Sequence, residues 1–282
     1  MEFHSESNIY VGEVNLKVTN LERSLRFYQE VIGFQIVEQS ERKAKLSANG
    51  KTVLLSIEQP ENVTAKERNT TGLYHFALLL PNRSDLADIV NHFVKIGLPI
   101  GSSDHLVSEA LYFSDPDGNG IEIYADRVPA QWTWKDGEVQ MTVDPLDFKD
   151  LLSEAKQEWK GLPAKSVMGH IHLHVSELSD IEEFYIKGLG FEVVSHLGSQ
   201  ALFIATGKYH HHIGLNTWAG EGAPAPSENS AGLSWYSLVF PSKEARERVV
   251  RQLEGIGSSV HEEEEGVLLT RDPSGNRIHL LV

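Results

Sequence analysis

Histidines gather in the middle of this chain, in segments where they could bind a metal or transfer protons. His170, His172 and His174 alternate along one segment, and three consecutive histidines follow at residues 210–212. The chain has no cysteine, so any bound metal must be held by His, Asp, Glu or water, which favours borderline or hard metals. A neutral imidazole also exchanges protons near physiological pH, so these residues are candidates for acid-base chemistry as well.

The elements that must position these side chains follow from an internal repeat. The string VTNLERSLRFY at residues 18–28 is echoed as VSELSDIEEFY at residues 175–185, an offset of 157 residues. The same offset relates DPDGN at residues 115–119 to DPSGN at residues 272–276. The chain therefore consists of two homologous halves.

Each half divides again into two units of one strand, one helix and three further strands. In the first unit Val14, Leu16 and Val18 alternate with polar residues, as in a half-buried strand. Asn20 or Thr19 can then cap a helix, which a later glycine ends. The four predicted βαβββ units span residues 8–60, 72–127, 167–218 and 231–282.

Comparing the halves shows where chemical groups replace apolar ones on a shared scaffold. His170 in unit three corresponds to Glu13 in unit one, and Glu122 in unit two corresponds to His279 in unit four. The other matched pairs are His75 with Trp235, Tyr112 with Leu269, His211 with Leu54 and His212 with Leu55. Units two and three hold almost all the titratable groups, so we expect the functional site where these two units meet.

The four units, the L-x-x-S-x-x-F-Y-x-x-x-x-G-F pattern at residues 21–34 and the D-P-x-G-N turns resemble the vicinal-oxygen-chelate superfamily. The resemblance implies an α+β fold with two domains of open, cup-like mixed sheets. The domains would be residues 1–128 and 166–282, joined by a linker at residues 129–165. The superfamily includes ring-cleaving dioxygenases, glyoxalases, transferases and metal-free binding proteins, so the fold alone does not choose a chemistry.

In that superfamily, first-strand residues of paired units and the last strand of one unit supply metal ligands. Pairing units two and three then offers His75, Glu122 and His170. Two neutral imidazoles and one carboxylate form the facial triad expected of a non-haem Fe(II) oxygenase, with three adjacent positions left for substrate and O2. The sequence does not distinguish Fe(II) from Mn(II).

A second resemblance is more specific. Residues 104–122 read DHLVSEALYFSDPDGNGIE and resemble the extradiol ring-cleavage pattern of a His, a hydrophobic-Tyr pair, D-P-x-G and a metal-binding Glu. Ser103 departs from it, since the family usually has another small or β-branched residue there. Together with GHIHLHV at residues 169–175 and YHHHIGLN at residues 209–216, the whole chain resembles the two-domain catechol 2,3-dioxygenases of Bacillus-type bacteria.

This resemblance implies an oxidoreductase that cleaves a catechol-type aromatic diol with O2. Tyr112 and His105 would hydrogen-bond the diol oxygens, as their motif positions imply. For the acid-base step we choose His212, with His211 in reserve. Adjacent strand residues face opposite sides, so only one of these two is expected to point into the cup.

Two alternatives stay open. If units one and two paired instead, Glu13, His75 and Glu122 would form a carboxylate-rich site suited to a glyoxalase-type metal-dependent isomerase or lyase. A metal-free small-molecule binding protein of the same fold is the other alternative. In the second cup, Trp235 and His279 are interpreted as a degenerate site kept for packing.

Composition narrows the partners. The 282-residue chain carries a formal net charge of −15 and no basic stripe, which argues against nucleic-acid binding. It contains no apolar run long enough to span a membrane and no export-signal layout, so we expect no membrane partner and a cytoplasmic location. The expected partners are a small aromatic diol and O2, and a homo-oligomer is left open.

Overall fold

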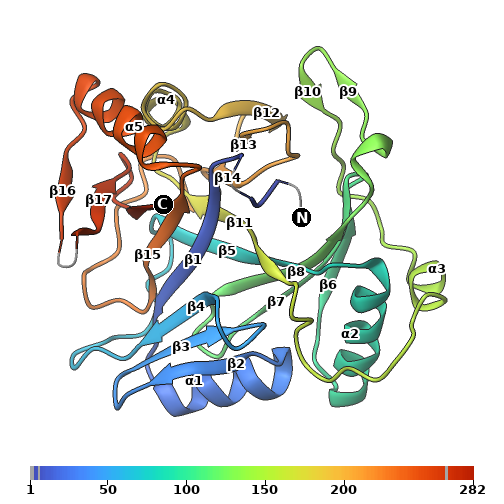
Figure 1. Cartoon of the computed structure of the whole chain (residues 1–282). Helices are drawn as coiled ribbons and strands as arrows, with labels where there is room; N and C mark the ends of the chain where they lie inside the picture. Colours follow the sequence, from blue (N-terminus) through green and yellow to red (C-terminus); the bar gives the residue numbers. More distant parts are fainter. Residues whose placement is uncertain (1–2, 6, 264–265) are drawn as a thin grey trace.

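The computed structural model describes residues 3–5, 7–263 and 266–282. In this described part, the chain forms two eight-stranded mixed sheets and a short two-stranded one, with helices packed on the outside (Figure 1). The predicted α+β fold of four βαβββ units is confirmed by the order of the elements.

The four units have the following elements. Unit one contains β1 (Tyr10–Lys17), α1 (Leu21–Phe27), β2 (Gln35–Gln39), β3 (Lys43–Ser47) and β4 (Val53–Glu58). Unit two contains β5 (Gly72–Leu79), α2 (Arg83–Ile96), β6 (Gly101–Asp104), β7 (Ser108–Ser114) and β8 (Gly120–Asp126). Unit three contains β11 (Val167–His174), α4 (Leu178–Glu182), β12 (Glu192–Leu197), β13 (Ala201–Ala205) and β14 (Ile213–Asn216). Unit four contains β15 (Gly232–Val239), α5 (Lys243–Gly255), β16 (Val260–Glu262), β17 (Leu268–Arg271) and β18 (Arg277–Leu281).

Each large sheet combines one unit from each half of the chain. Strands β1 and β15 pair antiparallel and join units one and four, while β5 and β11 pair antiparallel and join units two and three. The strand orders are β16-β17-β18-β15-β1-β4-β3-β2 and β12-β13-β14-β11-β5-β8-β7-β6. The predicted domains 1–128 and 166–282 therefore exchange sheet partners across the linker, and their boundaries stay a prediction.

Contacts within each half link its two units. The Tyr28 hydroxyl, at the end of the first helix, donates to the Asp115 carboxylate in the turn before β8, over 2.8 Å. The repeat-equivalent Tyr185 donates to Asp272 over 2.9 Å. These tyrosines lie in wider helical turns, Tyr28–Ile32 and Glu183–Gly188, that continue α1 and α4. The repeated F-Y and D-P-x-G-N strings are thus two ends of one buried contact.

The first helix begins and ends where its sequence predicts. The Asn20 side chain accepts a hydrogen bond from the Arg23 backbone N–H over 2.9 Å, and so satisfies one of the free donors at the N-terminus. Gly33 ends the helical segment with a φ of 93°, in the left-handed region that favours glycine. The capping prediction for this helix is confirmed at Asn20.

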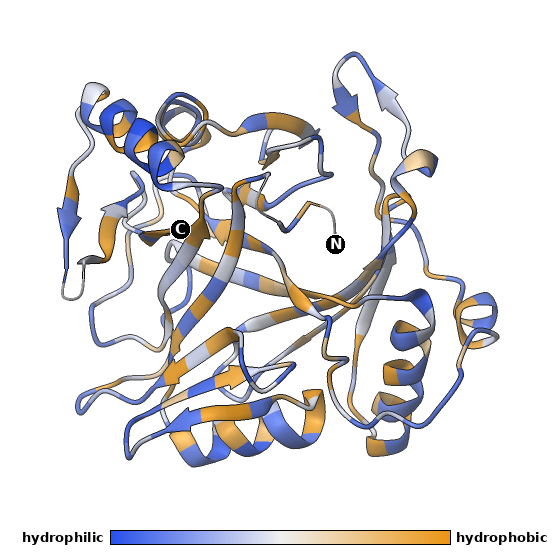
Figure 2. Ribbon diagram, viewed as in Figure 1, coloured by the Kyte–Doolittle hydropathy of each residue, from blue (hydrophilic) through white to orange (hydrophobic). Residues whose placement is uncertain are grey.

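The core lies between the sheets and their covering helices. Strand residues alternate between apolar and polar along most strands, and the outer faces of α2 and α5 are hydrophilic (Figure 2). Helix α2 buries Leu86, Ile89, Val90 and Phe93 at helical spacing. Among the helices that the structure describes, none is both long and apolar enough to cross a membrane.

The segment between units two and three carries small elements of its own. These are a short 3-10 turn (Pro129–Gln131), the hairpin β9 (Trp134–Lys135) and β10 (Glu138–Val139), and α3 (Phe148–Leu152). Trp132 is buried, and its indole N–H donates to the carbonyl of Val107, 3.2 Å away. Because this segment packs against unit two, it is placed to contribute to a site there.

Candidate metal centre

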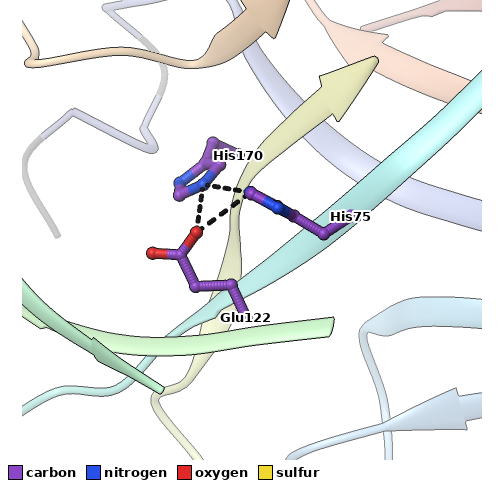
Figure 3. Close-up of side chains that lie close together, drawn as sticks. All are labelled: His75, Glu122 and His170. Carbon is purple, nitrogen blue, oxygen red and sulfur yellow. Dashed lines mark hydrogen bonds and ion pairs between the residues drawn. The ribbon is translucent and has the colours of Figure 1, made fainter. Parts of the chain in front are cut away.

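Three buried side chains from units two and three converge on one point (Figure 3). His75 lies on β5, Glu122 on β8 and His170 on β11. The Nε2 atoms of His75 and His170 each lie 3.0 Å from the Glu122 Oε2 atom. The two Nε2 atoms lie 3.3 Å from each other. The structure thus brings the predicted ligand set together, while its role in binding a metal stays a prediction.

Strand register explains this convergence. Ala77 on β5 is opposite His170 on one side and Glu122 on the other. His75 lies two residues before Ala77, so its side chain emerges on the same face. Gly120 pairs with His75, and a Cβ there would lie only 2.1 Å from the Tyr74 carbonyl oxygen. Glycine at that position therefore allows β8 to approach β5 closely beside the triad.

The donor set fits a divalent metal ion. Two ligand atoms bound at right angles, each about 2.1 Å from an ion, are about 3.0 Å apart, close to the spacing of these three atoms. The Nδ1 atom of His170 is buried and has no hydrogen-bond partner within the described residues. Elsewhere in those residues, no other group of three His, Asp or Glu side chains brings its ligand atoms within 4.8 Å of one another.

The electrostatics hold these groups in their metal-binding forms. Burial opposes ionisation of Glu122, but the adjacent imidazoles of His170 and His75 lower the pKa of its carboxyl well below the usual value. Burial lowers the pKa of His170, against the opposing effect of Glu122. An ionised carboxylate beside a neutral imidazole is the combination that coordinates divalent metals.

Tyr112 and His105 form a hydrogen-bonded pair next to the triad. Tyr112 on β7 pairs with Glu122 on β8, and its hydroxyl lies 2.6 Å from the His105 Nε2 atom. The His105 Nδ1 atom lies 2.6 Å from the Thr142 carbonyl oxygen, which can only accept, so Nδ1 carries the proton and Nε2 accepts from Tyr112. Burial and the charge of Glu122 raise the pKa of Tyr112 well above its usual value, so the phenol stays protonated.

The choice of His212 over His211 does not fit the structure. His211 lines the cavity beside the triad, and its ring centroid lies 4.1 Å from that of His170. His212 faces away, where its Nδ1 accepts from the Thr206 backbone N–H and its Nε2 lies 3.1 Å from the Phe3 carbonyl oxygen. Both histidines precede β14, and neighbouring residues in extended backbone point to opposite faces. The reserve choice, His211, therefore has the right orientation.

Two residues behind His211 were missed by the sequence reasoning. His210 lies between His211 and the Asp126 carboxylate, in contact with both. Asp126 follows Glu122 by four residues on β8, so the alternation of strand side chains places both on one face. That period-two spacing is the signal that could have identified Asp126.

A cavity of about 350 Å³ opens beside the triad. Its walls include Tyr112, His105 and His211, together with His172 from β11. Met141, Thr142 and Val143 of the connecting segment also line it, so this segment closes one side of the site. The cavity is therefore built from units two and three and the chain between them.

The second cup differs in kind. The rings of Trp235 and His279 stack with centroids 4.2 Å apart and planes 16° from parallel. The Ser56 hydroxyl donates to Glu13, whose pKa is raised by burial. Glu13 belongs to the sheet of units one and four, so the carboxylate-rich site of the isomerase alternative is not formed.

Comparisons with known proteins agree with this geometry. A family model described as the Glyoxalase/Bleomycin resistance protein/Dioxygenase superfamily matches residues 10–123. The catechol-2,3-dioxygenase of Bacillus subtilis (strain 168) is 47% identical over 268 residues, which cover 94% of this chain and 94% of that protein.

Solved structures share the fold. A candidate dioxygenase from Bacillus subtilis subsp. subtilis str. 168 has a TM-score of 0.64 at 14% identity, covering 96% of this chain and 84% of that one. Glyoxalase I from Zea mays has a TM-score of 0.58 at 15% identity, covering 96% of this chain and 92% of that one. At these identities the likeness extends to the fold alone.

Proposed function

The chain belongs to the glyoxalase/bleomycin resistance protein/dioxygenase superfamily and is an oxidoreductase similar to catechol-2,3-dioxygenase, and on that premise we propose that it cleaves a catechol-type diol with O2. The proposed reaction is extradiol and depends on Fe(II). His75, Glu122 and His170 would hold the metal ion.

One observation carries the proposal. Two imidazole nitrogens and one carboxylate oxygen lie 3.0 to 3.3 Å apart at the edge of a cavity that can admit a small aromatic ring. Such a triad occupies one face of an octahedral ion and leaves the opposite face for a bidentate diol and O2. A metal-free binding protein would have no use for this arrangement.

When bound, the metal supplies the redox chemistry that allows O2 to react with the diol. The protein must orient the diol and move its protons. The Tyr112 hydroxyl directs its own proton to His105, so its oxygen is free to accept a hydrogen bond from a diol hydroxyl. His211, on the other wall, takes a proton from the diol and returns it to the product.

The overall reaction balances without another reductant. One ring carbon-carbon bond next to the diol breaks, and both atoms of O2 enter the ring-opened product. The aromatic ring supplies the electrons that reduce O2. The residues therefore need to provide only binding, orientation and proton transfer.

The test is anaerobic reconstitution of the purified protein with Fe(II), followed by catechol and air. We expect uptake of one O2 per catechol and the appearance of a yellow ring-fission product. Parallel samples loaded with Mn(II) or Zn(II) identify the metal, and Glu122→Gln protein provides the inactive control. Turnover of thiol-aldehyde adducts by the Zn(II) or Ni(II) form, without O2 uptake, would replace this proposal by the isomerase alternative.

The cytoplasmic location and a homo-oligomeric state stay predictions. Gel filtration with light scattering measures the oligomeric state directly.

A further inference from the structure

The cavity beside the triad has an apolar mouth. Val143, Leu197 and Trp218 line it, yet 68%, 43% and 41% of their surfaces are exposed. They come from three separate segments: the connection before α3, the end of β12 and the loop after β14. Exposed large apolar side chains gathered around one opening mark a surface that binds an apolar group.

An aromatic wall connects this mouth to the reacting end of the cavity. Phe203 on β13 lies beside His211, with ring centroids 5.0 Å apart. Trp218 lies 5.3 Å from His172 and 5.2 Å from Tyr74, measured between ring centroids. A ring held at the triad would therefore direct any outward substituent along an aromatic and aliphatic surface.

The same cavity offers no cation to an acidic substituent. Of the described residues that line it, none is a lysine or an arginine. The His196 imidazole stands at the mouth, but its Nδ1 atom lies 2.8 Å from the Glu138 carboxylate and is already partnered. A carboxylate buried without a partner carries a large desolvation penalty.

We propose that the substrate is a catechol bearing an uncharged apolar substituent, which lies against Val143, Leu197 and Trp218, and that carboxylated catechols are rejected. This inference rests on the proposed dioxygenase function and names the substrate class of the same site. The mouth selects by two means: it removes apolar surface from water, and it leaves an ionised group without a counter-charge.

The test compares substrates on the Fe(II)-loaded enzyme. The probes are catechol, its 3- and 4-methyl and 3- and 4-ethyl derivatives, and 3,4-dihydroxybenzoate. For the better of the two substituent positions, we expect kcat/KM to rise about fourfold for each methylene buried. We expect 3,4-dihydroxybenzoate to react with a kcat/KM at least tenfold below that of catechol.

Charge variants test the named residues. Leu197→Lys should lower the ratio of kcat/KM for 4-ethylcatechol to that for catechol about tenfold and raise the relative rate with 3,4-dihydroxybenzoate. Val143→Lys provides an independent second variant, and both positions are exposed enough to accept lysine without unfolding. Val94→Lys is the matched control, since Val94 is 72% exposed on α2 and does not line the cavity.

The outcomes separate this inference from the function on which it rests. If catechol itself is not consumed by the Fe(II) form, the dioxygenase proposal fails. If catechol is consumed and 3,4-dihydroxybenzoate reacts as well as the ethylcatechols, the enzyme is a dioxygenase but the substrate class is wrong. Identical ratios in the Leu197→Lys, Val143→Lys and Val94→Lys proteins also overturn the assignment of the mouth.

Discussion

The Nδ1 atoms of His210 and His211 lie 2.8 Å apart, and the Nε2 atom of His210 lies 2.8 Å from the Asp126 carboxylate. A carboxylate accepts, so His210 donates through Nε2 and presents an unprotonated Nδ1 to its neighbour. His211 then donates through Nδ1, which leaves its Nε2 unprotonated. This chain fixes the tautomer of the imidazole that lines the cavity.

His210→Ala should therefore impair catalysis without removing the metal. We expect kcat to fall roughly tenfold to a hundredfold, KM to change less than threefold, and iron content to stay constant. His210→Asn should restore part of kcat, because its amide oxygen can accept from the His211 Nδ1–H. Equal losses in both variants would show that His210 serves only packing. His92→Ala, a partly buried histidine outside the cavity, controls for a general loss of stability.

The two histidines before β14 are expected to differ in function. His211→Phe should retain iron and lose about 10²-fold or more in kcat, the usual contribution of a positioned acid-base group. His212→Phe should keep kcat within a few-fold, because that ring faces Phe3 and Thr206 instead of the cavity. Steady-state kinetics with iron analysis decides, and the reverse order of effects would restore His212 as the acid-base residue.

The internal repeat was sufficient to predict much of this architecture. Because Tyr28 and Tyr185, or Asp115 and Asp272, recur at one offset, each half served as a template for the other. The contrast between His170 and Glu13 pointed to units two and three, which do share a sheet. The comparison worked because a duplicated scaffold keeps its core while its polar positions diverge.

Other features depend on geometry that a repeat does not encode. The orientation of His211 and His212 is set by the phase of the pleat, and a shift of one residue reverses it. Met141 and Val143 belong to a segment with no repeat partner and no clear periodicity, so nothing in the sequence placed them at the cavity. His210 and Asp126 meet only because β8 and the loop before β14 approach each other after folding.

Metal binding should depend on Glu122 and leave the second cup unaffected. Glu122→Gln should lose retained iron, whereas Glu13→Gln, at the repeat position of His170 in the other sheet, should keep it. A metal at about a thousand times its Kd adds about 4 kcal/mol to the free energy of unfolding, a rise of about 8 °C in Tm. We expect that rise in the wild type and in Glu13→Gln only. A comparable rise in Glu122→Gln would exclude Glu122 as a ligand.

The stability of the metal-free protein should fall between pH 6.5 and pH 4, in part because of His4. Burial lowers the pKa of His4 to about 4, despite the hydrogen bond of its Nε2 to the Gly169 carbonyl. In that window the unfolded chain binds a proton that the folded chain refuses, so stability decreases as pH falls below 6.5. The expected contribution of His4 between pH 7 and pH 5 is about 2 kcal/mol.

Urea unfolding of wild-type and His4→Phe protein at both pH values measures this contribution. Loss of the hydrogen bond to Gly169 lowers the stability of the variant by a similar amount at each pH, because it does not involve proton uptake. The titration affects only the wild type, so its stability should drop by about 2 kcal/mol more than that of the variant. Equal drops would mean that His4 takes up its proton as readily in the folded chain as in the unfolded one, and that its burial has no effect on titration.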